Sequence, residues 1–254
     1  MYLFSRKIIK YKGFICGMLT GNYGLLEFNK VLSDSEVKKN RKKYLDDLGI
    51  NLNETVFQEQ KHSSHISIIN LKDRGRGARS LKNIIKSNDG MISNEKNLFL
   101  CSFSADCVPV SLFDPGTCAF GMVHSGWRGT LNLITKKAVE KLKDAFGTEY
   151  AKLICYLGPS IKNCCYEVSK ASDNRIKDFE NRFGSDIIIR KNDEIFLDLQ
   201  EAIRIQLQEL GVLRKNIEVS NYCTCCSKEY NFPSFYRDRG NIKNSILSIT
   251  GIRN

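Results

Sequence analysis

The sequence predicts an α/β (α+β) protein, a single-domain sandwich in which helices flank a mixed β-sheet. Segments with the periodicity of amphipathic helices alternate with short apolar segments of strand length. No change in composition, glycine- and serine-rich linker or internal repeat divides the 254 residues. We therefore expect one domain that spans residues 1–254.

Three segments have the apolar spacing of helices that are buried on one side. In the first, residues 34–48, Asp34 or Ser35 can cap the start and Gly49 can end the helix. The second covers residues 130–146 and precedes Gly147. The third covers residues 198–210 and precedes Gly211.

Short apolar segments between these helices have the length of strands. They cover residues 98–103, 108–113, 118–124, 153–157, 187–189 and 217–219, and the segment 65–69 is also strand-like. The segments 98–103 and 118–124 are too apolar to be half-exposed. We expect these two to be central strands that are covered on both faces.

The charge balance is basic, with 39 Lys and Arg residues against 28 Asp and Glu residues, a net charge of +11. Because these lysines are scattered along the chain, they indicate solvated faces rather than a nucleic-acid-binding surface. Residues 1–10 lack the apolar core of a signal peptide, and no segment approaches the ~18 apolar residues of a membrane span. We expect a cytoplasmic protein that binds neither membranes nor nucleic acid, with most of its 10 cysteines as free thiols.

The segment around His124 is the most informative for function. His124 ends a predicted strand, and residues 125–130 lead directly into a helix. Ligands of open α/β sheets bind at the carboxyl ends of strands, and a helix N-terminus offers free N–H groups to anions. Arg128 in this turn can add a bidentate contact to a phosphate or carboxylate. The alternative is a tight connection that contains a structural histidine.

Cys107 and the two remaining histidines complete a candidate metal site. Cys107 lies at the junction of two predicted strands, and Asp106 beside it is a candidate for orienting a ligand histidine. His62 and His65 are three residues apart, so spacing does not choose between them. Two imidazoles and one thiolate suit Zn²⁺, with copper as the softer alternative, and leave a fourth position open for substrate. An inert buried cysteine is the competing interpretation of Cys107.

Two other segments are rich in sulfur. One contains Cys164 and Cys165, and the other contains Cys223, Cys225 and Cys226. Paired C-x-x-C spacing is missing between the two segments. We therefore expect buried thiols here rather than a second metal site.

Several motifs together resemble the YfiH family, also called the laccase-domain or multicopper polyphenol oxidoreductase family. The resemblance runs from about Gly13 to Ile249. The motifs QKHS, SADCVPV and HSGWRG are similar to the family patterns Q-V-H-G, T-A-D-C-x-P-V and H-A-G-W-R-G. The later motifs LGPSIKNCCYEV, CT and SFYRD resemble G-P-x-I-x-x-C-C-Y-E-V, C-T and S-Y-R-R-D.

This resemblance implies a laccase-type catalytic domain whose metal-linked catalytic residues are His62, Cys107 and His124, which selects His62 over His65. It implies phosphorolysis of adenosine, inosine and related nucleosides to base and ribose-1-phosphate, with deamination of adenosine as a further activity. Purine nucleosides and phosphate are the expected small-molecule partners, at a zinc-type site.

The expected roles extend to four further residues. Arg128 and Arg237 are expected to bind substrate or phosphate, and Asp106 and Glu167 are candidates for moving a proton. At Tyr236 the chain departs from the family, which often carries Arg there, so weaker phosphorolysis is expected if that arginine contacts phosphate.

Three other functions compete with this interpretation. A hydrolase that edits the cell-wall precursor UDP-MurNAc-L-Ser would use Cys107 as nucleophile and His124 as its base. Copper-dependent phenol oxidation is disfavoured, because a multicopper oxidase needs many more histidines than the 3 present. A non-catalytic metal-binding protein would have its fourth coordination position filled. The sequence does not indicate an oligomeric state.

Overall fold

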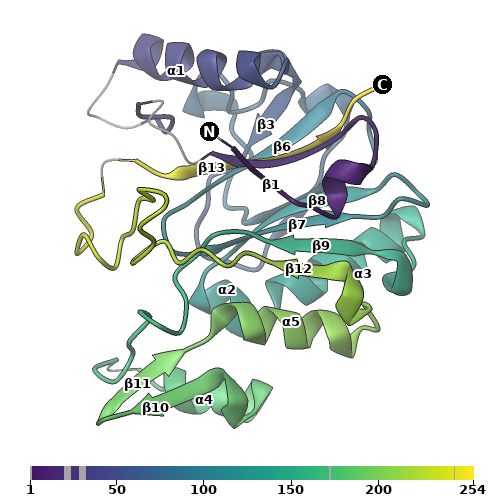
Figure 1. Ribbon diagram of the computed structural model, residues 1–254. Helices are drawn as coiled ribbons and strands as arrows, with labels where there is room; N and C mark the ends of the chain where they lie inside the picture. The colour runs from purple at the N-terminus through teal and green to yellow at the C-terminus, as the bar shows by residue number, and fades with distance from the viewer. Residues whose placement is uncertain (1, 20–23, 29–32, 172, 243) are drawn as a thin grey trace.

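The protein is layered as helix, sheet, sheet and helix (Figure 1). The computed structural model describes residues 2–19, 24–28, 33–171, 173–242 and 244–254. The predicted α/β class, with mixed sheets flanked by helices, is confirmed. The strands are divided between two large sheets, where the sequence had indicated one.

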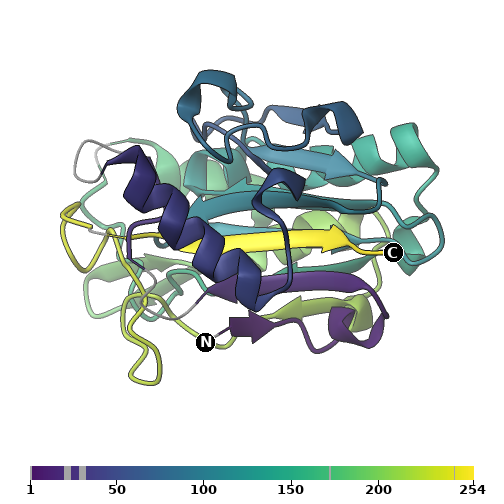
Figure 2. The same ribbon diagram turned by 90° about the horizontal axis from the view of Figure 1, so that it is seen from above.

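The upper sheet in Figure 1 has five strands and carries both ends of the chain. Helix α1 (Asp34–Asp47) covers its outer face and crosses the strands obliquely in Figure 2, packing Tyr44 and Leu45 against Phe99 and Leu247. Ser33 caps this helix in a capping box with Glu36, one residue before the predicted cap. All strand pairs are antiparallel except β3 with β6. The order is β1 (Tyr2–Phe4), β2 (Phe14–Leu19), β13 (Ile246–Ile252), β6 (Leu98–Ser104) and β3 (Thr55–Phe57).

The lower sheet has six strands and supports the chemistry described below. Helices α3 (Ile134–Phe146) and α5 (Leu199–Glu209) cover its outer face. Its outermost pairs, β12 with β9 and β4 with β5, are parallel, and the others are antiparallel. The order is β12 (Ile217–Val219), β9 (Ile154–Leu157), β7 (Val108–Phe113), β8 (Phe120–Ser125), β5 (Gly90–Ser93) and β4 (Ile66–Ile68).

The inner faces of the two sheets pack against each other. Met18 and Leu100 of the upper sheet share one apolar cluster with Met122 and Tyr156 of the lower sheet. Strands β6 and β8 each have a neighbour on both sides and are buried almost throughout. The prediction that these two strands are central is confirmed.

Two predicted elements differ from the structure. The continuous helix over residues 130–146 is wrong, because Leu133 adopts a left-handed conformation (φ 60°) that separates α2 (Trp127–Leu131) from α3. The strand predicted at 187–189 belongs to neither large sheet, since β10 (Ile188–Lys191) pairs only with β11 (Glu194–Leu197) beside α4 (Arg175–Phe183).

Short 3₁₀ turns occupy Ile8–Lys10, Leu52–Glu54, Leu71–Asp73, Leu81–Asn83, Tyr150–Lys152, Ser185–Ile187 and Arg214–Asn216.

Within the described ranges, none of the helices has both the length and the apolar character that a bilayer span requires.

Gly251 sets a packing limit in the middle of the upper sheet. A Cβ at this position would lie 2.3 Å from the carbonyl oxygen of Leu98 and 2.5 Å from the Phe99 ring. We expect Gly251→Ala to lower the free energy of unfolding by about 2 kcal/mol or more, because the backbone cannot move aside without breaking strand pairing. Urea unfolding of both proteins measures this. Gly116→Ala is the control, since its Cβ would meet only a side-chain oxygen at 3.3 Å. Equal losses in the two variants would contradict the prediction.

Candidate metal centre and cavity

The register of one antiparallel pair brings Cys107 to His124. Strands β7 and β8 place Val108 opposite Ser125 and Pro109 opposite His124. Cys107 immediately precedes β7, and His124 is the penultimate residue of β8. The two side chains therefore meet at the same end of the lower sheet, although they are 17 positions apart in the sequence.

Asp89 fixes His124 and the loop that carries His62. It precedes β5, whose register with β8 places it beside His124, and its carbonyl oxygen accepts from the His124 backbone N–H at 2.7 Å. Its carboxylate lies 3.0 Å from His124 Nδ1. The same carboxylate accepts from the N–H groups of Lys61, His62 and Ser63 at 2.7–3.1 Å and from the Ser63 hydroxyl at 2.7 Å. These contacts hold His62 in a left-handed conformation with φ 56°.

The three predicted ligand side chains converge. One donor atom from each of His62, Cys107 and His124 lies within 4.8 Å of the others, and His62 Nε2 is 3.7 Å from Cys107 Sγ. A nitrogen and a sulfur on one tetrahedral zinc ion are roughly 3.6 Å apart. A Cβ on Gly126 would lie 2.8 Å from Cys107 Sγ and 2.9 Å from the His62 ring, so only glycine leaves this space open. The donor set and the space fit a metal ion.

Cys107, His124 and Asp89 each stabilise the charged form of a neighbour in the centre. Burial raises the pKa of the Cys107 thiol, but the charge and hydrogen bonds of His124 and His62 outweigh it and lower this pKa to about 6. Burial lowers the pKa of His124, but Cys107 and Asp89 outweigh it and raise this pKa to about 9. Burial raises the pKa of Asp89, but hydrogen bonds from His124 and Ser63 lower it to about 2. The arrangement favours a thiolate, which is the form that binds metal.

The three side chains open into a cavity of about 870 Å³, which is large enough for a small-molecule ligand. Two cations flank the Trp127 ring in its wall: Arg128 Cζ lies 4.3 Å and Arg175 Cζ 3.9 Å from the ring centroid. Arg175 also donates to the Tyr166 hydroxyl at 3.0 Å. The wall thus combines positive charge with aromatic surface, which further includes Phe28, Phe103, Phe235 and Tyr236.

Asp106 and His65, which the sequence also offered for the metal site, are not among the converging donor residues. Asp106 accepts from Thr224 Oγ1 at 2.5 Å, Ser234 Oγ at 3.1 Å and the Tyr236 N–H at 2.7 Å. The idea that Asp106 orients a ligand histidine is therefore wrong, and Asp89 occupies that position. His65 is exposed and lies outside the described metal-binding group.

The two remaining candidates differ in their relation to the cavity. Arg237 donates to the carbonyls of Thr224 at 3.2 Å and Phe232 at 3.0 Å and pairs with Asp238. The described residues that line the cavity do not include Arg237. Glu167 does line it, and its Oε1 accepts from the Ser169 N–H at 2.6 Å.

Asp89 and Arg175 are the site residues that sequence reasoning missed. Asp89 stands in an Asn-Asp-Gly segment that resembles an ordinary turn. Arg175 follows a cluster of polar residues and begins a short helix, which no motif marks. The sequence alone does not reveal that Asp89 and Arg175 lie near the metal centre and its cavity, because only the folded arrangement of the strands and helices brings them there.

Comparison with known proteins extends this picture. Residues 15–249 match the family model described as multi-copper polyphenol oxidoreductase laccase. The chain is 34% identical over 211 residues to purine nucleoside phosphorylase YlmD of Bacillus subtilis, covering 82% of this chain and 74% of that one. It is 29% identical over 209 residues to adenosine deaminase RL5 from an unknown prokaryotic organism, covering 81% and 77%. The crystal structure of the hypothetical protein YfiH from Bacillus licheniformis superposes with a TM-score of 0.89 at 30% identity, covering 99% and 96%.

Asp89→Asn tests the anchoring carboxylate. We expect the free energy of unfolding to fall by about 3 kcal/mol at pH 7, because a buried imidazolium and several N–H groups lose their charged acceptor. Since the folded-state pKa of about 2 lies below the ordinary ~3.9, this stability is complete above pH ~4 and is lost as the pH falls towards 2. Urea unfolding from pH 7 to pH 3 should show the two proteins converging at low pH, with the exposed Asp144→Asn as control. A difference that stays constant with pH would contradict this.

Alkylation reports the state of Cys107 directly. In chelator-treated protein we expect its reaction with iodoacetamide, followed by peptide mass spectrometry, to rise with pH through a midpoint near the pKa of about 6. His124→Asn removes the neighbouring cation and should move the midpoint upward, towards the ~8.5 of an ordinary thiol. A wild-type midpoint near 8.5 would show that no thiolate–imidazolium pair forms.

Proposed function

Since this chain belongs to the multi-copper polyphenol oxidoreductase laccase family, we propose that it is a purine nucleoside phosphorylase that also deaminates adenosine. One observation carries the proposal: the donor atoms of His62, Cys107 and His124 converge on a cavity that also presents guanidinium groups and aromatic rings. The names of the relatives, purine nucleoside phosphorylase and adenosine deaminase, support both reactions.

We assign zinc rather than copper to the centre. Imidazole and thiolate are both zinc ligands, and three protein ligands with an open fourth position are typical of catalytic zinc sites. The chain has 3 histidines, which is too few for the several coppers of a phenol oxidase. When bound, the ion supplies Lewis-acid activation at the open position.

Arg128 and Arg175 are proposed to bind phosphate. Arg128 is exposed at the cavity, and no described carboxylate lies within ion-pair distance of it, so its donors are free for an anion. Stacking on Trp127 restricts both side chains and lowers the entropic cost of ordering them. Phosphorolysis then requires one phosphate oxygen to bond to ribose C1′ while the C1′–N9 bond breaks and its electron pair passes to the purine. The cavity residues hold phosphate and nucleoside in line for this exchange.

Glu167 is proposed to carry the proton during deamination. Hydrogen bonds from Ser169 lower the pKa of this carboxyl, so it is ionised at neutral pH and can act as a base. It would take a proton from the water that attacks C6 of adenosine and pass it to the departing ammonia. The Tyr236 hydroxyl, 3.5 Å from Glu167 Oε2, lies where it can orient this carboxylate.

Cys107 and His124 are also arranged like a cysteine nucleophile and its histidine base. The hydrolase that acts on the cell-wall precursor is therefore the competing function. In that enzyme Cys107 would attack the substrate, and His124 would act as its base. Activity would then survive removal of metal and would be lost on alkylation of the thiol. Phosphorolysis at a zinc centre predicts loss of activity on both treatments.

The direct test incubates metal-analysed protein with adenosine or inosine, with and without phosphate, and separates the products by chromatography. We expect free base and ribose-1-phosphate only with phosphate, and inosine from adenosine in either case. Cys107→Ala should lower both rates at least roughly 100-fold, because a metal ligand is lost. Arg128→Ala should raise KM for phosphate about tenfold or more, since a hydrogen bond to a charged group contributes ~1.5–3 kcal/mol.

Arg190→Ala is the matched control, because this exposed arginine pairs with Glu180 outside the cavity wall. It should leave KM unchanged. Zinc-loaded protein that turns over neither nucleoside, but hydrolyses UDP-MurNAc-L-Ser, would establish the competing function instead.

A further inference from the structure

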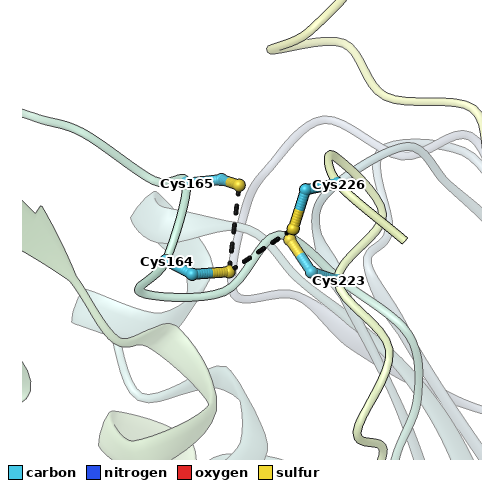
Figure 3. A group of neighbouring side chains, drawn as sticks. All are labelled: Cys164, Cys165, Cys223 and Cys226. Atoms are coloured by element: carbon cyan, nitrogen blue, oxygen red, sulfur yellow. Dashed lines mark hydrogen bonds between the residues drawn. The ribbon is translucent and has the colours of Figure 1, made fainter. Parts of the chain in front are cut away.

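A second group of sulfur atoms lies outside the centre described above. Cys164 and Cys165 on the loop after β9 face Cys223 and Cys226 on the loop after β12 (Figure 3). Their four Sγ atoms lie within 4.8 Å of one another, although Cys164 and Cys226 are 62 positions apart. Only Cys223 is buried. The expectation of buried thiols in these segments is therefore wrong for Cys164, Cys165, Cys225 and Cys226.

The spacing of these sulfurs is that of a metal site. Cys164 Sγ lies 3.8 Å from Cys165 Sγ and 3.7 Å from Cys226 Sγ. Two thiolates on one tetrahedral zinc ion, with Zn–S of about 2.3 Å, are roughly 3.8 Å apart. The bonded sulfurs of a disulfide are ~2.05 Å apart, which is far shorter. Cys223 and Cys226 also have the C-x-x-C spacing that zinc sites commonly use.

The backbone fixes the two cysteine loops side by side. An isolated bridge joins Ser160 to Cys223, and the Thr224 N–H donates to the Ser160 carbonyl at 3.0 Å. This pairing holds Cys223 close to the loop that carries Cys164 and Cys165, so the sulfur atoms are brought together before any ion binds.

We infer that Cys164, Cys165, Cys223 and Cys226 bind a Zn²⁺ ion that is separate from the His62, Cys107 and His124 centre. Four cysteine ligands fill the tetrahedral shell and leave no position for substrate, so the ion is structural. Binding converts the thiols to thiolates and releases their protons to solvent. This inference does not depend on the proposed catalytic activity.

The ion would tie one wall of the cavity to the loop that contacts Asp106. Tyr166 and Glu167 follow Cys165 directly, and both line the cavity. Thr224, within the second loop, donates to Asp106 beside Cys107. A crosslink between these loops would therefore hold the cavity wall against the strands that carry the first centre.

Metal content tests this inference. Protein purified under reducing conditions is loaded with zinc, dialysed and measured by plasma mass spectrometry. We expect two zinc ions per wild-type chain, one for each group of converging ligands, and one in Cys164→Ser/Cys226→Ser. Cys225→Ser is the matched control, because it removes an adjacent thiol outside the group and should retain both ions.

A second measurement remains valid even if the cysteine variants fail to fold. His62→Ala/Cys107→Ala removes two ligands of the first centre and leaves the buried His124–Asp89 pair intact. X-ray absorption of the zinc it retains should show four sulfur neighbours at roughly 2.3 Å, without nitrogen. The inference is overturned if this variant retains no zinc, if its zinc has nitrogen or oxygen neighbours, or if the four cysteines form disulfides in the zinc-loaded protein.

Discussion

The buried carboxylate of Asp89 is the interaction on which the metal centre depends. His124 stands on a strand, whereas His62 stands on a loop with no regular structure of its own. The carboxylate joins them through the His124 ring and three successive backbone N–H groups. Burying a charge without partners is costly, but here both oxygens are saturated by donors, so the cost is offset. The strand register that places Asp89 beside His124 therefore also determines where His62 lies.

Much of the secondary structure was predictable, because strong periodicity reports burial directly. Helix α5 begins at Leu199, one residue after the predicted start at Asp198, and β6, β7 and β9 lie within one residue of the predicted segments. The division into two sheets was not predictable, since the C-terminal strand β13 inserts between β2 and β6, and no local pattern encodes such a distant pairing. The break at Leu133 was also hidden, because its helical spacing continues through a residue in the left-handed region.

The candidate site was also only partly predictable from the sequence. His124 and Cys107 were visible because strand ends and a following helix mark them, and family resemblance separated His62 from His65. Asp89 was missed because its role follows from the β5–β8 register alone. The C-x-x-C spacing of Cys223 and Cys226 is present in the sequence, but it supplies only two of the four sulfur atoms. Only the parallel pairing of β12 with β9 brings those segments together.

The negative charges of the centre and the positive charges of the cavity wall suit different ligands, a metal ion and an anion respectively. The thiolate of Cys107 and the carboxylate of Asp89 together carry two negative charges, which match those of one divalent ion. A centre balanced in this way has little net charge with which to attract phosphate. Under the proposed function, recognition of phosphate would then come from the cavity wall, where Arg128 and Arg175 stack on Trp127. Asp173 forms an ion pair with Arg175 at 2.9 Å, whereas it acts on Arg128 only through its charge, without an ion pair. Under the proposed function, we therefore expect selectivity for phosphate to depend most on Arg128.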